Sequence, residues 1–248
     1  LFRSIETEYW HHRSPWMEDM RRASVSALGH MLGSHYDVRI LTSTGDGGRE
    51  AFAANLIAPG DVAWVSPEGS FAPVLRRLGA DVRTVTGTRL PEAAPTAVFL
   101  DHVREDGSVT DLPRLVRRIR GAHPGALVVV DLSWSFGADD IDFSALECDG
   151  YLIVPERALG SIPGAAVIAL RESLRKRIVQ TRARMRTIPY SFDLLKYDQA
   201  WGKTTTPYSP SISSIVGLAT TLELIAANGG LPAHAKRHGA YAKTFRAG

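Results

Sequence analysis

The chain of 248 residues lacks the features of an oxidised or membrane setting. Its single cysteine, Cys148, excludes an internal disulfide bond and fits a reducing compartment. No apolar run reaches the roughly 18 residues of a membrane span. The first residues do not form a signal-peptide pattern. We therefore expect a cytoplasmic protein without a membrane partner.

Signals for metals, nucleic acids and nucleotides are also missing. His30 and His35 have no cysteine or carboxylate partner at ligand spacing, and no nucleophile elbow or P-loop is present. The net charge of +3 is small. The basic clusters at 117–120 and 175–177 are predicted to be solvated helix faces, since no basic stripe with interleaved aromatics occurs. We expect neither a metal site nor a nucleic-acid partner.

Strand-like and helix-like segments alternate along the chain, which predicts an α/β fold with a mostly parallel sheet and helices on both faces. The predicted strands are residues 38–41, 62–65, 82–85, 97–100, 126–130, 151–154 and 165–170. The predicted helices are residues 15–32, 71–78, 112–120 and 211–227, a helix after the turn 42–48 that runs to about 57, and the helix-like stretch 234–246. No linker or internal repeat interrupts them, so residues 1–248 are predicted to form one domain.

Two strand ends carry candidate ligand groups. The Gly-rich turn around Thr44, Gly45 and Asp46 feeds a helix, and the free N–H groups at a helix start suit a phosphate. An ordinary strand-to-helix turn is the alternative. Asp131 ends an apolar strand at the carboxyl edge, where open α/β sheets bind ligands. Its alternative is a capping or turn aspartate.

Six segments follow one another in a recognisable order. They are His12-Arg13-Ser14-Pro15, residues 41–51, Pro59-Gly60-Asp61, residues 129–137, residues 151–164, and Thr205-Thr206-Pro207. Together they resemble the class V aminotransferases, pyridoxal-phosphate (PLP) enzymes of the alanine–glyoxylate and serine–pyruvate type. The resemblance implies the large domain of PLP fold type I and a homodimer. It also implies that the family's C-terminal small domain, which follows the segment matching Gly248, is absent or truncated here.

The resemblance assigns roles to several residues. Thr44, Gly45 and Asp46 would form the phosphate cradle. Phe71 would lie against the pyridine ring, with a helix residue buried in the core as the alternative. Asp131 would pair with the ring nitrogen, and Ser133 would pack beneath the ring. Lys203 and Thr206 match positions from which the neighbouring subunit contacts the phosphate.

The same resemblance places Arg157 where the family has the lysine that forms the Schiff base with PLP. A guanidinium stays protonated at any working pH and cannot form that bond. Pro155-Glu156 replaces a Ser-Gln-like pair, and residues 104–108 carry an arginine and two carboxylates where the family reads Glu-Thr-Ser-Thr-Gly. We expect Arg157 to pair with Glu105, Asp106 or Glu156, because a buried unpaired charge is costly.

Three hypotheses follow, and they leave open whether the chain is an enzyme. In the first, a divergent protein binds PLP, pyridoxamine phosphate (PMP) or another phosphate-bearing ligand non-covalently, and acts on a small amino or keto acid in a specialised biosynthetic pathway. In the second, a non-catalytic homologue, a pseudoenzyme, serves as a partner or scaffold. In the third, a working aminotransferase uses another lysine, such as Lys203.

Overall fold

A seven-stranded sheet forms the centre of the computed structural model, which describes residues 11–33, 35–143, 145–185, 187–201 and 206–247. The strand order is β1-β7-β6-β5-β4-β2-β3. The strands are β1 (Asp37–Thr42), β2 (Val62–Val65), β3 (Asp81–Thr84), β4 (Ala97–Asp101), β5 (Leu127–Asp131), β6 (Gly150–Ile153) and β7 (Ala165–Leu170). All seven predicted strands are present, each within one residue at either end.

The sheet is mostly parallel, as predicted. β3, β2, β4, β5 and β6 run in one direction, and β7 is antiparallel to both of its neighbours, β6 and β1. The carboxyl ends of the parallel strands therefore meet at one edge, where Asp101 of β4 is the register partner of Asp131 of β5.

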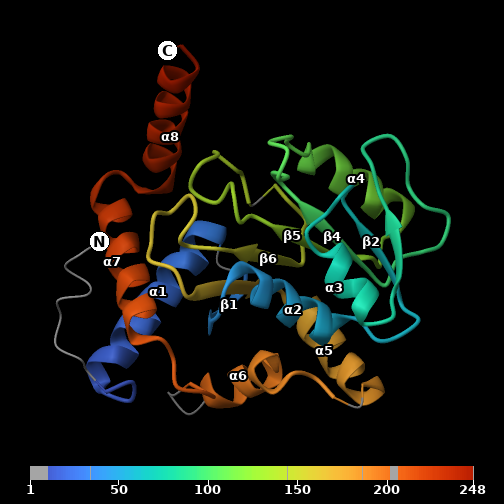
Figure 1. The fold of residues 1–248 in the computed structure, drawn as a ribbon, viewed down its shortest axis with the longest axis horizontal. Coiled ribbons are helices and arrows are strands. Elements are labelled where there is room, and N and C mark those ends of the chain that lie inside the picture. The colour runs from blue at the N-terminus through green and yellow to red at the C-terminus, as the bar shows by residue number, and fades with distance from the viewer. Residues whose placement is uncertain (1–10, 34, 144, 186, 202–205, 248) are drawn as a thin grey trace.

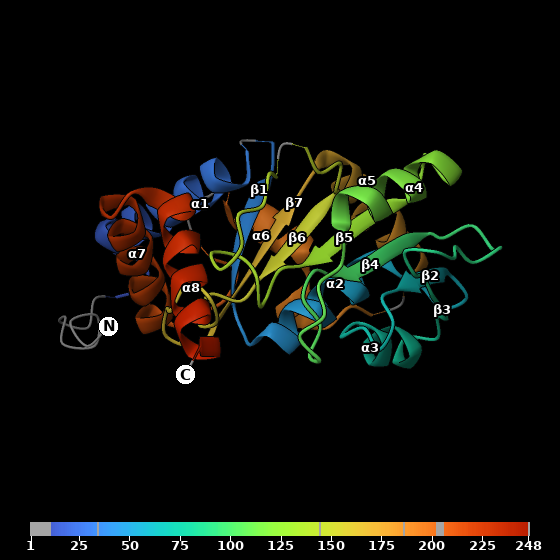
Figure 2. The ribbon, with the colours of Figure 1, turned by 90° about the horizontal axis from the view of Figure 1, so that it is seen from above.

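Helices cover both faces of the sheet (Figures 1 and 2). The helices are α1 (Pro15–Leu32), α2 (Gly45–Leu56), α3 (Ala72–Arg77), α4 (Leu112–Ala122), α5 (Glu172–Arg184), α6 (Leu194–Trp201), α7 (Ile212–Ala227) and α8 (Gly230–Ala247), with a short 3-10 turn at Tyr190–Phe192. The core on one face contains residues of α1, α4 and α7. The core on the other face contains residues of α2, α3, α5 and α6. Two layers of helix thus enclose the sheet.

The continuous apolar run of β5 follows from this arrangement. Val128 and Val130 face the α4 side of the sheet, and Val129 faces the α2 side. All three are fully buried. A strand covered on both faces needs apolar side chains at every position, not at alternate ones.

α5 shows that one basic cluster is not a solvated face, contrary to the sequence-based expectation. Arg177 forms an ion pair with the buried carboxylate of Asp61, and Arg184 Nη1 lies 2.8 Å from Asp61 Oδ1. On α4, Arg120 pairs in the same way with buried Asp149 at 2.5 Å. Asp61 directly precedes β2 and Asp149 directly precedes β6. The arginines therefore pair with carboxylates at the amino ends of strands, and their role is structural.

α8 projects from the body of the molecule (Figure 1). Ala235 is the buried residue of this helix. Leu231 of α8 packs against the core, and the Nε2 atoms of His234 and His238 lie 3.0 and 2.9 Å from the carbonyl oxygen of Ala158. Within the described residues, no single helix is long and apolar enough to cross a membrane, and α7 and α8 meet that test only as a pair bent by 88°.

Candidate functional site

A polar cleft of about 310 Å³ opens at the carboxyl edge of the parallel strands. It is lined by residues from the start of α2, the turn before α3, and the loops after β4 and β5. These are Asp46, Arg49, Glu68, Gly69, Ser70, Pro73, Asp101, Val103, Arg104, Glu105 and Trp134. This edge is where open α/β sheets generally bind ligands.

The start of α2 forms one end of the cleft. Thr44 caps the helix, and its hydroxyl accepts a hydrogen bond from the Gly47 N–H at 3.5 Å. Gly48 lets the helix lie close to the sheet, because a Cβ atom there would stand 2.5 Å from Leu152 of β6. The Thr44-Gly45-Asp46 turn is therefore held at the sheet edge with the first turn of the helix beside the cleft.

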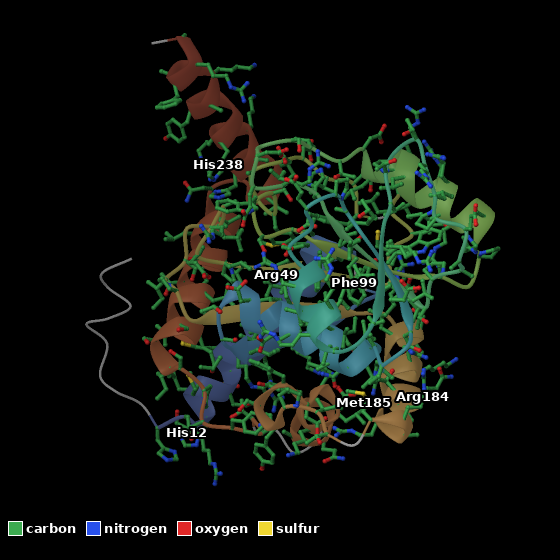
Figure 3. All side chains as sticks on the ribbon, turned by 45° about the vertical axis from the view of Figure 1, so that its right-hand side comes forward. His12, Arg49, Phe99, Arg184, Met185 and His238 are labelled. Carbon is green, nitrogen blue, oxygen red and sulfur yellow. The ribbon has the colours of Figure 1, made fainter. Side chains whose placement is uncertain are left out.

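Arg49 lines the cleft and contacts two carboxyl groups; Figure 3 labels it in the middle of the molecule. Its Nε donates to Asp131 Oδ2 at 2.8 Å, and its Nη1 donates to Asp46 Oδ1 at 2.7 Å. Burial by itself lowers the pKa of Arg49, but the charge and hydrogen bonds of Asp131 and Asp46 raise it above its ordinary value. Arg49 thus forms ion pairs with both the strand-end carboxylate and the acidic residue at the start of α2.

Ser133 fixes the orientation of Asp131. Its N–H donates to Asp131 Oδ1 at 2.7 Å, and its hydroxyl donates to the same oxygen. Arg49 Nη2 lies 3.4 Å from the Ser133 hydroxyl. Asp131 is 4 % exposed, and both of its oxygens have protein donors.

Asp101, on the neighbouring strand, has a different environment. Its Oδ1 accepts hydrogen bonds from the hydroxyl and the N–H of Ser70, but its buried Oδ2 has no partner in the described part of the chain. Burial raises the pKa of Asp101 to about 6, the Ser70 hydroxyl opposes this rise, and the nearby charge of Asp131 adds to it. Ser70 Oγ also lies 3.3 Å from Asp131 Oδ2, so this hydroxyl stands between the two carboxyl groups and donates its single hydrogen at the shorter contact, to Asp101.

Arg157 lies in the turn after β6, and its side chain is exposed. Its guanidinium carbon stands 4.1 Å from the centre of the Trp134 ring, a cation–π contact. The expected ion pair with Glu105, Asp106 or Glu156 is wrong, since no such pair forms among the residues described. An exposed guanidinium keeps its hydration and needs no buried counter-ion.

The turn that carries Arg157 is held by α8. The next residue, Ala158, offers its carbonyl oxygen to the imidazoles of His234 and His238. Figure 3 shows His238 on the part of α8 nearest the body of the molecule. Arg237 Nη2 lies 3.2 Å from His234 Nδ1, which makes that ring nitrogen the acceptor and leaves Nε2 to donate to Ala158.

The other residues that the sequence predicted for the site, Phe71 and Thr206, do not line the cleft. Phe71 is fully buried and packs between Phe52 and Phe99, with ring centroids 6.5 and 4.8 Å away. The residue before it, Ser70, is the one that reaches the cleft. Thr206 donates its hydroxyl hydrogen to the Tyr208 carbonyl at 2.7 Å. Lys203 lies outside the described residues.

Sequence reasoning assigned no site role to several lining residues of the cleft, among them Arg49, Ser70, Asp101 and Trp134. A usable signal existed for Asp101. Like Asp131, it directly follows an apolar strand, and the carboxyl ends of adjacent parallel strands meet at one edge. Arg49 carries no such signal, because an arginine in the first turns of a helix is usually solvated.

Comparison with known proteins identifies the family. The family model described as aminotransferase class-V matches residues 90–247. The chain belongs to the class V aminotransferase family. In this family member the matched region includes Asp101, Asp131 and Arg157, whereas Arg49 lies ahead of it.

Curated relatives of this class V aminotransferase homologue include a hydrogenase subunit and a transaminase. The chain is 26 % identical over 246 residues to the soluble hydrogenase 42 kDa subunit of Anabaena cylindrica, covering 88 % of this chain and 61 % of the relative. It is 27 % identical over 224 residues to pyridoxamine–pyruvate transaminase of Mesorhizobium japonicum, covering 81 % and 55 %. The chain thus spans about three fifths of the length of such relatives.

Solved structures support the fold. An alanine–glyoxylate aminotransferase from Nostoc sp. superposes with a TM-score of 0.85 at 22 % identity, over 98 % of this chain and 68 % of the other. The class V aminotransferase homologue is therefore an α/β protein of the PLP-transferase fold.

The residues of the cleft fit the family's cofactor only in part. The start of α2 offers N–H groups for a phosphate. The ring end does not fit a protonated pyridine, because Arg49 already pairs with Asp131 and a second cation there would be repelled. No chemical step through a Schiff base is therefore derived for this chain.

Proposed function

We propose that this aminotransferase-like protein binds a phosphate-bearing ligand non-covalently in the cleft, and that it lacks transamination through an internal lysine. PLP, PMP and related phosphate esters are the ligands to test. Arg157 stands, on this proposal, where the family's anchoring lysine would be. The ion pair between Arg49 and Asp131 is the observation that carries the proposal.

That ion pair changes what the cleft selects. In the family, the carboxylate matching Asp131 holds the ring nitrogen protonated, which makes the ring an electron sink. Here a guanidinium that cannot be deprotonated occupies Asp131 Oδ2 at 2.8 Å. Selection for a protonated ring is thereby lost, while the polar cleft at the sheet edge is retained.

The phosphate end is supported by the charge balance at the start of α2. A carboxylate beside a phosphate is repulsive unless it is paired, and Asp46 is paired with Arg49 at 2.7 Å. The helix is 12 residues long, so its N-terminal N–H groups and dipole favour an anion. The named activity of the transaminase from Mesorhizobium japonicum makes pyridoxamine-type ligands a sensible first choice.

The test is an absorption titration of the purified protein with PLP and with PMP, followed by borohydride trapping and intact-mass analysis. Saturable binding without a covalent adduct is the expected result. A visible aldimine band with a reducible adduct would contradict the proposal, and peptide mapping would then ask whether Lys203 carries it. Absence of binding by every phosphate ester would favour a partner or scaffold role instead.

A further inference from the structure

Asp101 and Asp131 face one another across adjacent strands, but only one of them has a cation. Their Cα atoms are register partners at the carboxyl ends of β4 and β5. Arg49 forms an ion pair with Asp131. Within the described residues, no ion pair is formed by Asp101, although it is 6 % exposed. A buried carboxylate in this condition is costly unless something supplies a positive charge.

The unpartnered oxygen of Asp101 lies at the wall of the cleft. Asp101 lines the cleft, and its Oδ2 is fully shielded within the protein without a hydrogen-bond partner among the residues described. Gly69 packs directly against this oxygen, since a Cβ atom there would stand 2.9 Å from Oδ2 and 2.8 Å from the Ser66 carbonyl oxygen. Ser70 holds the other oxygen, Oδ1, so the carboxyl group is fixed in orientation.

The lining of the cleft adds to the demand for a cation. Four carboxyl side chains line it, on Asp46, Glu68, Asp101 and Glu105, against the guanidinium groups of Arg49 and Arg104. Arg49 is engaged by Asp46 and Asp131, and Arg104 lies 3.7 Å from Asp106. Glu68 has a left-handed backbone conformation, with φ of 50°. Residues other than glycine rarely adopt this conformation, and those that do are often found at ligand sites.

We propose that Asp101 is the recognition site for a primary ammonium group, so that the ligand of this cleft carries an amine as well as a phosphate. This inference deepens the proposed function and rests on it for the phosphate end. Charge-assisted hydrogen bonds from an ammonium group to Oδ2 would satisfy the atom that the protein leaves without a partner.

A path of close polar contacts joins the two ends of the cleft. Ser70 stands between Asp101 and Asp131, and Arg49 joins Asp131 to Asp46 at the start of α2. Both ends are therefore fixed to one rigid set of strand ends and one helix. Preorganised groups of this kind bind a ligand with little further ordering cost.

The test compares three probes by isothermal titration calorimetry. O-phosphoethanolamine carries both groups, ethyl phosphate lacks the amine, and ethanolamine lacks the phosphate. At about pH 8 the unmodified protein is expected to bind O-phosphoethanolamine about tenfold more tightly than ethyl phosphate, since a charge-assisted contact replaces an unpaired carboxylate. In D101N the two affinities are expected to become equal. D81N, which alters an exposed carboxylate on β3, is the matched control and should keep the preference.

A pH series on the unmodified protein tests the same point without a mutation. The preference for the amine is expected to fall as the pH drops below about 6, where Asp101 becomes protonated. The charged groups nearest to Asp101 are Asp131 and Arg49, and Glu68, Arg104 and Glu105 line the same cleft. D101N removes the part of the pH effect that belongs to Asp101 and leaves the part that belongs to the others.

The outcomes separate the two proposals. Equal affinity of the unmodified protein for O-phosphoethanolamine and ethyl phosphate would overturn the amine site and leave phosphate binding standing. Binding of neither phosphate ester would overturn the phosphate cradle. Ethanolamine binding would then test the amine site by itself. Loss of ethanolamine binding in D101N would support the amine site, and unchanged binding would overturn it.

Discussion

The guanidinium of Arg49, which lines the cleft, and the carboxylate of Asp131 form an ion pair at 2.8 Å from positions 82 residues apart in the chain. In an enzyme that uses PLP, the strand-end carboxylate is available to the cofactor ring. Here the protein supplies its own counter-ion. Among the described residues, Asp131 therefore has a cationic partner from the protein, and Asp101 has none.

Removing Arg49 should destabilise the protein. R49M leaves the carboxylate of Asp131 buried with only the donors of Ser133, and the loss of one partner of a buried pair typically costs about 3–5 kcal/mol. R49M combined with D131N should recover most of that loss. Urea unfolding of the single and double variants measures the coupling, and simple additivity of the two changes would show that the pair has no energetic role.

On the proposal that Arg157 stands where the family has its lysine, a lysine at position 157 should capture PLP covalently only when Asp131 is also released. R157K supplies a primary amine on the turn after β6, and R49M frees the carboxylate for the ring nitrogen. We expect a visible aldimine band and a borohydride-stable adduct at position 157 in the R49M/R157K variant, and little of either in R157K alone.

The matched control for this variant is R49M/R104K, which also releases Asp131 but places the lysine elsewhere in the same cleft. It should give no adduct, because the amine is not at the turn that follows β6. Equal labelling of R49M/R104K and R49M/R157K would mean that any lysine near the cleft reacts, and the assignment of position 157 would then be wrong.

The stability of the protein should depend on pH through Asp101. Its pKa in the folded state is raised from 3.8 to about 6, so its stabilising contribution is complete below about pH 4 and is lost as the pH rises through about 6. D101N removes the ionised form and should raise the free energy of unfolding by about 1–3 kcal/mol at pH 8.

The measurement is thermal unfolding of both proteins at several pH values. The gain in Tm from D101N should vanish near pH 4, where the carboxyl group of the unmodified protein is already protonated. A gain that is constant from pH 4 to 8 would indicate a change in packing and would remove the electrostatic explanation.

Asp61 should be among the most sensitive carboxylates for stability. It is buried, accepts the Ala58 N–H at 2.9 Å, and pairs with Arg177 and Arg184 of α5. D61A is expected to cost about 3–5 kcal/mol, because two guanidinium groups and a backbone donor lose their partner. D81A, which breaks the exposed pair with Arg83, should leave Tm almost unchanged in the same assay.

Much of the fold could be predicted because local signals and global packing agree. Ser14 and Pro15 mark the start of α1, and Ser14 Oγ accepts the Met17 N–H as a helix cap. The apolar runs of β4, β5 and β7 indicate strands buried on both faces. α5 was predicted only as a basic helix face at residues 175–177, without bounds, because its 13 residues carry many charges and its few buried residues, Leu174, Ile178 and Thr181, give a weak pattern.

The site was less predictable than the fold. Asp46 lines the cleft and Asp131 contacts its lining residue Arg49, since strand ends and helix starts can be located from sequence. Phe71 has the right residue type for a ring contact, but the direction of its side chain, into the core between Phe52 and Phe99, depends on how α3 docks. The ion pair expected for Arg157 is replaced by stacking on Trp134, because the turn after β6 leaves the guanidinium in solvent.

By itself, the sequence determined the order of strands and helices, the parallel sheet, the family resemblance and the arginine in the turn after β6. These features depend on residue type and spacing along the chain. Only the tertiary structure decided which charges meet. Arg49 reaches Asp131 and Ser70 reaches Asp101 because α2, β4 and β5 converge at one sheet edge. Electrostatic partners are selected by distance in space, which spacing along the chain does not encode.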